Sequence, residues 1–213
     1  MNVSSNALNR VEAALLDLDL EALRSLVVET LATTPKLEVF ETLVAPALER
    51  IGRSWEEGDL ALAQVYMASR LVERIVEEHL ISGQLAHRSQ PPIAMAVLED
   101  HHILGKRLVL ASLRMDGWAV DDWGVTSDPV LLAERAHGAG LGILLISTLM
   151  DRSARRVAEV VGTLKRLGAS TLVVVGGAPF RLNPGLCHEV GADATVAEAS
   201  AVPALLASLV GVP

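Results

Sequence analysis

The chain has 213 residues, 51% of them hydrophobic, so it can bury one large core or two smaller ones. Its formal net charge of -8 argues against nucleic acid as a partner, because phosphate binding needs a dense Lys and Arg surface. The single cysteine, Cys187, excludes an intrachain disulfide and a cysteine-only metal cage, and it fits a reducing cytoplasm. We expect no signal peptide, and no apolar run approaches the ~20 residues that span a membrane.

The first 83 residues have the pattern of four amphipathic helices joined by short loops. Apolar residues recur at helical spacing over 8–18, 23–31, 39–51 and 65–80. Pro46 lies inside the third of these segments and should kink that helix, because proline has no backbone N–H to donate. The sequence therefore predicts a four-helix bundle as a first domain over residues 1–83.

Residues 84–91 are polar, run into two prolines and are interpreted as a linker to a second domain over 92–213. Beyond the linker, short apolar runs alternate with helix-like segments. The expected strands are 93–98, 118–123, 141–146, 171–175 and 194–196, and the expected helices are 103–116, 151–167 and 183–190. This alternation predicts an α/β domain with a Rossmann-like, five-stranded parallel sheet in the flavodoxin-like order 2-1-3-4-5.

Polar residues and glycines follow three of the expected strands. They are Glu99, Asp100, His102 and Gly105 after the first strand, Ser147 and Leu149 after the third, and Gly176 and Gly177 after the fourth. An open parallel sheet presents its ligand at the carboxyl ends of its strands. We therefore expect these groups to meet at one edge of the sheet.

The residue types indicate a metal held by one imidazole. A histidine such as His102 is a good transition-metal ligand, and a nearby carboxylate usually accepts a hydrogen bond from its other ring nitrogen. Asp100 can supply that carboxylate, and Ser147 can extend the relay. Protein zinc sites use three or four ligands, so one histidine cannot hold a bare ion. The metal should arrive inside a macrocycle that supplies the other ligands.

The chain resembles the cobalamin-binding family that shares the signature D-x-H-x-x-G, S-x-L and G-G, including its spacing. The matching residues are Asp100, His102, Gly105, Ser147, Leu149, Gly176 and Gly177. The resemblance implies a cobalamin bound base-off, with its dimethylbenzimidazole tail in a slot of the second domain. By the same resemblance His102 ligates cobalt, Asp100 and Ser147 tune it, and Leu149, Gly176 and Gly177 line the slot. The family often has Gly where this chain has Glu99.

The resemblance extends to the helical domain. Residues 51–58 are similar to the I-G-x-x-(W/F)-x-x-G element of the family's cap, which covers the upper face of the corrinoid. Trp55, Tyr66 and Met67 are then candidates to face the upper axial ligand. Two alternatives stay open: Trp55 also suits a domain interface, and Tyr66 and Met67 equally suit the bundle core.

Three functions follow from the resemblance. The favoured one is a methyl carrier that serves partner methyltransferases, as a subunit rather than a complete enzyme. A cobalamin-dependent sensor and a cobalamin store are the alternatives. Light-sensing relatives carry a Glu-His pair after the cap tryptophan, where this chain has Val65 and Tyr66, and we expect no DNA-binding module before the cap. The hypothesis includes a cytoplasmic protein without nucleic-acid or membrane partners, with a homodimer as one assembly state.

Overall fold

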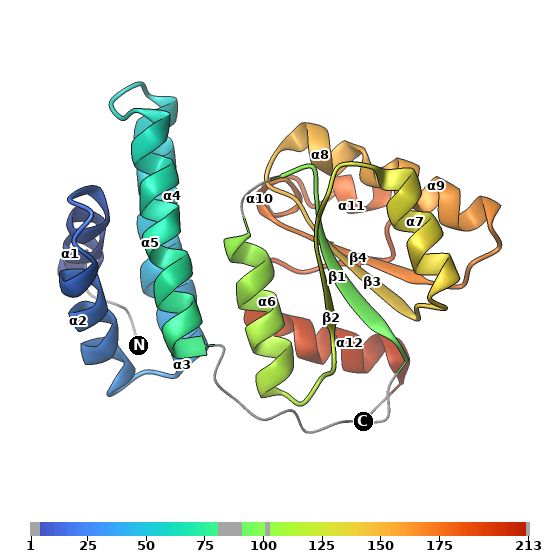
Figure 1. Ribbon diagram of the computed structural model, residues 1–213, viewed down its shortest axis with the longest axis horizontal. Coiled ribbons are helices and arrows are strands. Elements are labelled where there is room, and N and C mark those ends of the chain that lie inside the picture. The colour runs from blue at the N-terminus through green and yellow to red at the C-terminus, as the bar shows by residue number, and fades with distance from the viewer. Residues whose placement is uncertain (1–4, 81–90, 101–102, 212–213) are drawn as a thin grey trace. The chain divides into compact units, whose positions relative to one another are not determined.

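A computed structural model describes residues 5–80, 91–100 and 103–211 of the chain (Figure 1). Internal contacts divide the chain into two compact units, Met1–Gly83 and Gln84–Pro213. Across the three described ranges, no helix is both long enough and apolar enough to cross a membrane.

The first unit is built from helices that share an apolar core. Its elements are α1 (Ser5–Leu16), α2 (Leu20–Leu31), α3 (Lys36–Val39), the π-helix η1 (Phe40–Val44), α4 (Ala45–Glu56) and α5 (Leu62–Leu80). Because α3, η1 and α4 follow one another without a gap, they form one long helical segment. The unit therefore consists of four helical segments, as the sequence predicts. Fully buried side chains from all four segments meet in its interior, among them Leu15, Leu23, Phe40, Ile51 and Ile75.

The π-helix explains how the third helical segment accommodates Pro46. In η1 the Ala45 N–H donates to the Phe40 carbonyl, five residues back instead of four. Pro46 follows immediately at the start of α4, where a proline ring would crowd the carbonyl four residues earlier in a regular helix. A π-bulge relieves that conflict by widening one turn. The irregularity expected at Pro46 is therefore a widened turn just before the proline.

The second unit is a five-stranded parallel sheet with helices on both faces. Its strands are β1 (Ile93–Leu98), β2 (Asp121–Thr126), β3 (Ile143–Ser147), β4 (Leu172–Gly176) and β5 (Ala194–Thr195), in the order β2-β1-β3-β4-β5. Its helices are α6 (Leu104–Met115), α7 (Pro129–Gly138), α8 (Asp151–Arg155), α9 (Val157–Arg166), α10 (Ala178–Leu182), α11 (Leu186–Glu189) and α12 (Val202–Val210), with a short 3-10 turn at Ala199–Ala201. The predicted strand order is confirmed.

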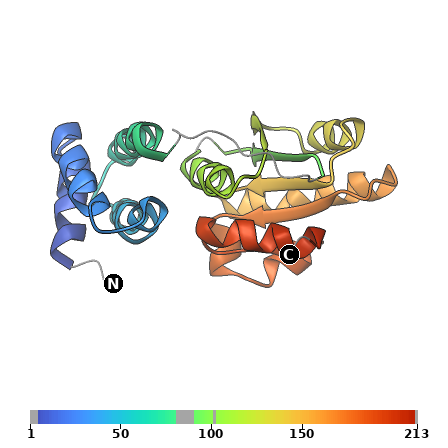
Figure 2. The ribbon, with the colours of Figure 1, turned by 90° about the horizontal axis from the view of Figure 1, so that it is seen from below.

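Side chains alternate between the two faces of the central strands, which explains the continuous apolar runs. Ile143 and Leu145 of β3 pack against α6 and α12, and Figure 2 shows α12 (red) along one side of the sheet. Leu144 and Ile146 pack on the other face, against α7, α8, α9, α10 and α11. Both faces of the strand are thus covered, as parallel sheets require.

Three features of the second unit differ from the sequence prediction, one being helix α12, which was not predicted. The strand expected at 118–123 lies three residues later, because Trp118 is buried in the preceding turn and donates its indole N–H to Asp116 at 3.0 Å. Helix α7 was not predicted, although Asp128 caps it by accepting from the N–H groups of Val130 (2.8 Å) and Leu131 (3.1 Å). The Asp-Pro pair that begins this helix is a start signal that the sequence contains.

An ion pair joins α6 to the edge strand β2. The Lys106 ammonium lies 2.6 and 2.8 Å from the two Asp122 carboxylate oxygens, and its side chain is only 7% exposed. We expect Asp122→Ala to lower the free energy of unfolding by about 2 kcal/mol, because it leaves a buried ammonium without its carboxylate. The value lies below that of a fully buried pair because the Asp122 side chain is 38% exposed. Urea unfolding measures the loss.

The same pair predicts a pH dependence of stability. Burial raises the pKa of Asp122, but hydrogen bonds from Lys106 and from the Gly124 N–H lower this pKa by a larger amount. The net shift of the Asp122 pKa is therefore downward. A carboxyl whose pKa is lower in the folded state stabilises the fold above its unfolded pKa of about 3.9 and loses this effect at lower pH. The difference between the wild type and Asp122→Ala should therefore shrink as the pH falls below about 4. A matched Lys106→Met variant, which keeps the apolar stem, should cost less than Asp122→Ala, and an equal cost would contradict this account.

Candidate functional site

The register of the sheet brings the ends of three strands together. Ser147, the last residue of β3, pairs with Val97 of β1 on one side and with Gly176 of β4 on the other. The segments that follow these strands therefore leave the sheet at one edge. This is the edge at which open α/β sheets bind ligands.

Asp100 fastens the segment after β1 to the segment after β3. Its side chain is buried, and Oδ2 accepts hydrogen bonds from the N–H groups of Leu149 at 2.6 Å and Met150 at 3.4 Å. Helix α6 begins at Leu104 without a side-chain cap, so Asp100 is not its N-cap. A carboxylate accepts up to about four hydrogen bonds, and the Leu149 bond uses one of those positions.

Gly105 and Ser147 lie next to each other. A Cβ built on Gly105 would be 3.6 Å from the Ser147 hydroxyl oxygen, so the start of α6 approaches the end of β3 closely. Strand alternation places the Ser147 side chain on the face covered by α6 and α12. Ser147 is 9% exposed, so its hydroxyl is nearly enclosed at this junction.

The two glycines after β4 differ in what surrounds them. A Cβ on Gly177 would be 1.7 Å from the Thr148 carbonyl oxygen, and the residue has φ +116, so only glycine fits. At Gly176 the nearest atom to an added Cβ is the Val196 carbonyl oxygen, at 3.9 Å. Gly177 is therefore required by the approach of its own backbone to the β3 end, whereas Gly176 leaves open space beside the strand.

Thr148 is a buried polar residue that the sequence analysis did not single out. It is 2% exposed, and its Oγ1 has no hydrogen-bond partner within the described part of the chain. Its N–H donates to the Gly176 carbonyl at 3.0 Å, so it still belongs to the β3–β4 ladder. Buried hydroxyls are normally paired, because burying one without a partner costs free energy. No sequence signal separates Thr148 from its neighbours.

The remaining predicted site residues lie elsewhere. His102, the expected cobalt ligand, is outside the residues that the structure describes. In the first unit, Tyr66 is 57% exposed and Met67 is 42% exposed, so the alternative that they belong to the bundle core is wrong. Trp55 near the end of α4 is 39% exposed. With Leu62, which is 59% exposed, these side chains form an exposed apolar surface on the last turn of α4 and the first turns of α5.

Fold and site together define a class: a parallel α/β domain with a ligand edge at the ends of β1, β3 and β4, preceded by a helical unit. Comparison with known families places the chain within that class. A family model described as a B12 binding domain matches residues 92–206, and a second model with the same description matches residues 7–78. The chain belongs to the B12-binding family, which confirms the cofactor class predicted from the sequence, a cobalamin-type corrinoid.

The relatives fall into two groups. Dimethylamine corrinoid protein 1 of Methanosarcina mazei is 25% identical over 205 residues, which cover 94% of each chain. The transcriptional repressor CarH of Myxococcus xanthus is 28% identical over 174 residues, 76% of this chain, and the match spans about half (54%) of the repressor. Among solved structures, the monomethylamine corrinoid protein of Methanosarcina barkeri superposes with a TM-score of 0.81 at 21% identity, covering 97% of this chain and all of that one. That likeness supports the fold.

The described residues at this edge of the sheet fit a corrinoid. Gly176 leaves space beside the end of β4, and the adjoining Ser147 supplies a nearly enclosed hydroxyl on the α6 side of the sheet. The buried Asp100 carboxylate stands two residues before His102 in the sequence and accepts the Leu149 N–H through Oδ2. A bulky group and a ligating imidazole would both find complementary surroundings at this edge.

Proposed function

We propose that this chain is a corrinoid methyl carrier, which receives a methyl group from one partner methyltransferase and delivers it to another. The observation that carries the proposal is the sheet edge where Asp100, Ser147 and Gly176 meet. The match to a dimethylamine corrinoid protein over 94% of both chains supports it.

In this proposal the corrinoid is bound base-off and supplies the cobalt that takes up and releases the methyl group. His102 would hold the cobalt. Asp100, already held at one oxygen by the Leu149 N–H, would accept the other imidazole N–H with its remaining capacity. The Leu149 bond thus fixes the carboxylate that orients the imidazole. Ser147 extends the relay, and Gly176 and Leu149 border the tail.

The helical unit is proposed to shield the upper face of the cofactor. Trp55, Leu62, Tyr66 and Met67 present large apolar side chains to solvent. Exposed apolar surfaces of this kind mark sites that contact another surface or a ligand. A corrinoid with its upper ligand would cover them.

The matching experiment mixes the methylcobalamin-loaded protein with a partner methyltransferase and its methyl acceptor, an amine or a thiol, and follows transfer of the methyl group from cobalt to that acceptor by absorption spectroscopy. A carrier gives up its methyl group only in the presence of the partner. The similarity of this chain to CarH makes a cobalamin-dependent sensor the second candidate. A sensor would instead bind adenosylcobalamin and change its oligomeric state in light. Binding without either response would indicate a store and contradict the carrier.

Location and assembly complete the proposal. A single cysteine, which is half-buried and whose pKa is raised by burial, fits a cytoplasmic protein without disulfides. Light scattering of the purified protein tests the homodimer, since one copy has a mass of 22.6 kDa.

Enlarging Gly176 tests the tail slot. We expect Gly176→Leu to fold but to lose at least tenfold in cobalamin affinity, because its side chain would occupy the space beside β4. Isothermal titration with methylcobalamin measures the loss. Gly176→Ala is the matched control, since its Cβ reaches only an ordinary contact distance from Val196. Full affinity in Gly176→Leu would show that the tail does not pass this residue.

A further inference from the structure

The peptide at Glu99 lies in a conformation that disfavours any side chain. Glu99 directly follows β1 and has φ +60, the left-handed region that glycine adopts readily. Its N–H donates to the Thr126 carbonyl at 2.7 Å, so the unusual turn is held against the end of β2. This turn sets the direction in which the chain leaves β1 and therefore where the next residue, Asp100, is placed. A non-glycine residue at this point needs compensating contacts to stay there.

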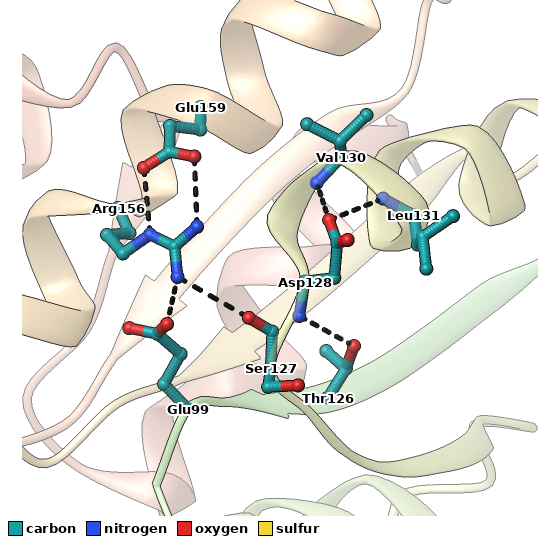
Figure 3. Close-up of polar contacts among 8 residues, drawn as sticks. All are labelled: Glu99, Thr126, Ser127, Asp128, Val130, Leu131, Arg156 and Glu159. Carbon is teal, nitrogen blue, oxygen red and sulfur yellow. Dashed lines mark hydrogen bonds and ion pairs between the residues drawn. The ribbon is translucent and has the colours of Figure 1, made fainter.

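Arg156 supplies such contacts from the chain that follows β3 (Figure 3). It lies between α8 and α9, and its guanidinium donates to the Glu99 carboxylate. The same guanidinium donates to the Ser127 carbonyl at 3.4 Å and to both Glu159 oxygens at 2.8 and 3.1 Å. The group thus joins the segment after β1, the segment after β2, and α9.

The Glu99–Arg156 contact is better protected than an ordinary surface pair. The Glu99 side chain is 18% exposed and the Arg156 side chain 30% exposed. Glu159 fixes the orientation of the guanidinium, and the hydrogen bond from Arg156 lowers the pKa of Glu159, so this carboxylate stays charged at neutral pH. A planar guanidinium held by two carboxylates and a carbonyl loses little further entropy when it orients Glu99.

We infer that the Glu99–Arg156 pair is a positioning device that holds the left-handed turn before Asp100 and so places the carboxylate that faces the cofactor. The inference rests on the proposed role of Asp100. It assigns a function to two residues outside the D-x-H-x-x-G signature. It also explains how a residue other than glycine is kept in this left-handed turn: the arginine compensates for the unfavourable φ.

The first test uses the protein without cofactor. The Leu149 N–H donates to Asp100, so its hydrogen exchange, measured by nitrogen-15 NMR, reports whether Asp100 is in place. We expect Arg156→Gln to accelerate this exchange at least tenfold. Arg155→Gln is the matched control, because the neighbouring Arg155 pairs with Asp151 and Glu189 on the surface, and it should leave the exchange unchanged.

The decisive comparison adds Glu99→Gly to Arg156→Gln. Glycine adopts φ +60 without support, so the double variant should restore slow Leu149 exchange although it has lost both charges. A merely structural role for Arg156 predicts no such rescue. Unchanged exchange in Arg156→Gln, or fast exchange in the double variant, would overturn the inference. Should Arg156→Gln fail to fold, Glu99→Gln removes the same pair while Arg156 keeps its contact with Glu159. Unchanged Leu149 exchange in Glu99→Gln, or fast exchange in the double variant, would then overturn the inference.

A second readout separates this inference from the proposed function. With cobalamin added, Arg156→Gln should lower the cobalamin affinity measured by isothermal titration, and the double variant should restore it. If the wild type binds no cobalamin, the proposed function fails, while the Leu149 exchange still tests the positioning. If cobalamin binds normally and Leu149 exchange is the same in every variant, only the positioning is wrong.

Discussion

His102→Ala is expected to change the absorption spectrum of bound cobalamin and to weaken its binding on the order of 100-fold, because in the proposed function His102 is the protein ligand to cobalt. The expectation follows from the signature position of His102, two residues after a carboxylate that is buried and held by the Leu149 N–H. Titration of the purified protein with methylcobalamin, followed by absorption spectroscopy, measures both effects.

His101 provides the matched control for this variant. It neighbours His102 but has the wrong offset from Asp100 and Gly105 for the signature. His101→Ala should therefore leave the spectrum unchanged. If His102→Ala kept the wild-type spectrum, or if His101→Ala changed it instead, the assignment of the cobalt ligand would be wrong.

Gly177→Ala should be the most destabilising single-methyl change at the site. The added Cβ would fall 1.7 Å from the Thr148 carbonyl oxygen at a residue with φ +116, so the ends of β3 and β4 would have to separate. We expect a loss on the order of 4 kcal/mol in the free energy of unfolding of the second unit. The backbone atoms on both sides leave no flexible side chain to absorb the clash.

The measurement must report on the second unit alone. Of the three tryptophans, Trp55 lies in the first unit, while Trp118 and Trp123 lie in the second. Urea unfolding followed by tryptophan fluorescence in a Trp55→Phe background isolates that transition. Gly176→Ala in the same background should cost less than about 1 kcal/mol. Equal losses at the two glycines would contradict the distinction drawn between them.

Much of the fold could be predicted from the sequence because local patterns carry it. The helical periodicity of the first 80 residues and the apolar runs at β1, β3 and β4 report burial directly, and their alternation implies a parallel sheet. The second strand was misplaced by three residues because Trp118 reads as a strand residue, although it is buried in the turn before the strand. Its burial depends on the adjacent α6 and also on α12, which lies more than 80 residues further along the sequence.

The candidate site was likewise predictable from the sequence only in part. The sequence by itself determined the cofactor class, because the signature residues and their spacing are local features of three strand ends. Only the tertiary structure decided what the individual residues contact. Asp100 accepts the Leu149 N–H, Gly177 lies against the Thr148 carbonyl, and Arg156 forms an ion pair with Glu99. These contacts join residues about 30 to 60 positions apart. Their partners are chosen by strand register and helix packing, which no local pattern in the chain encodes.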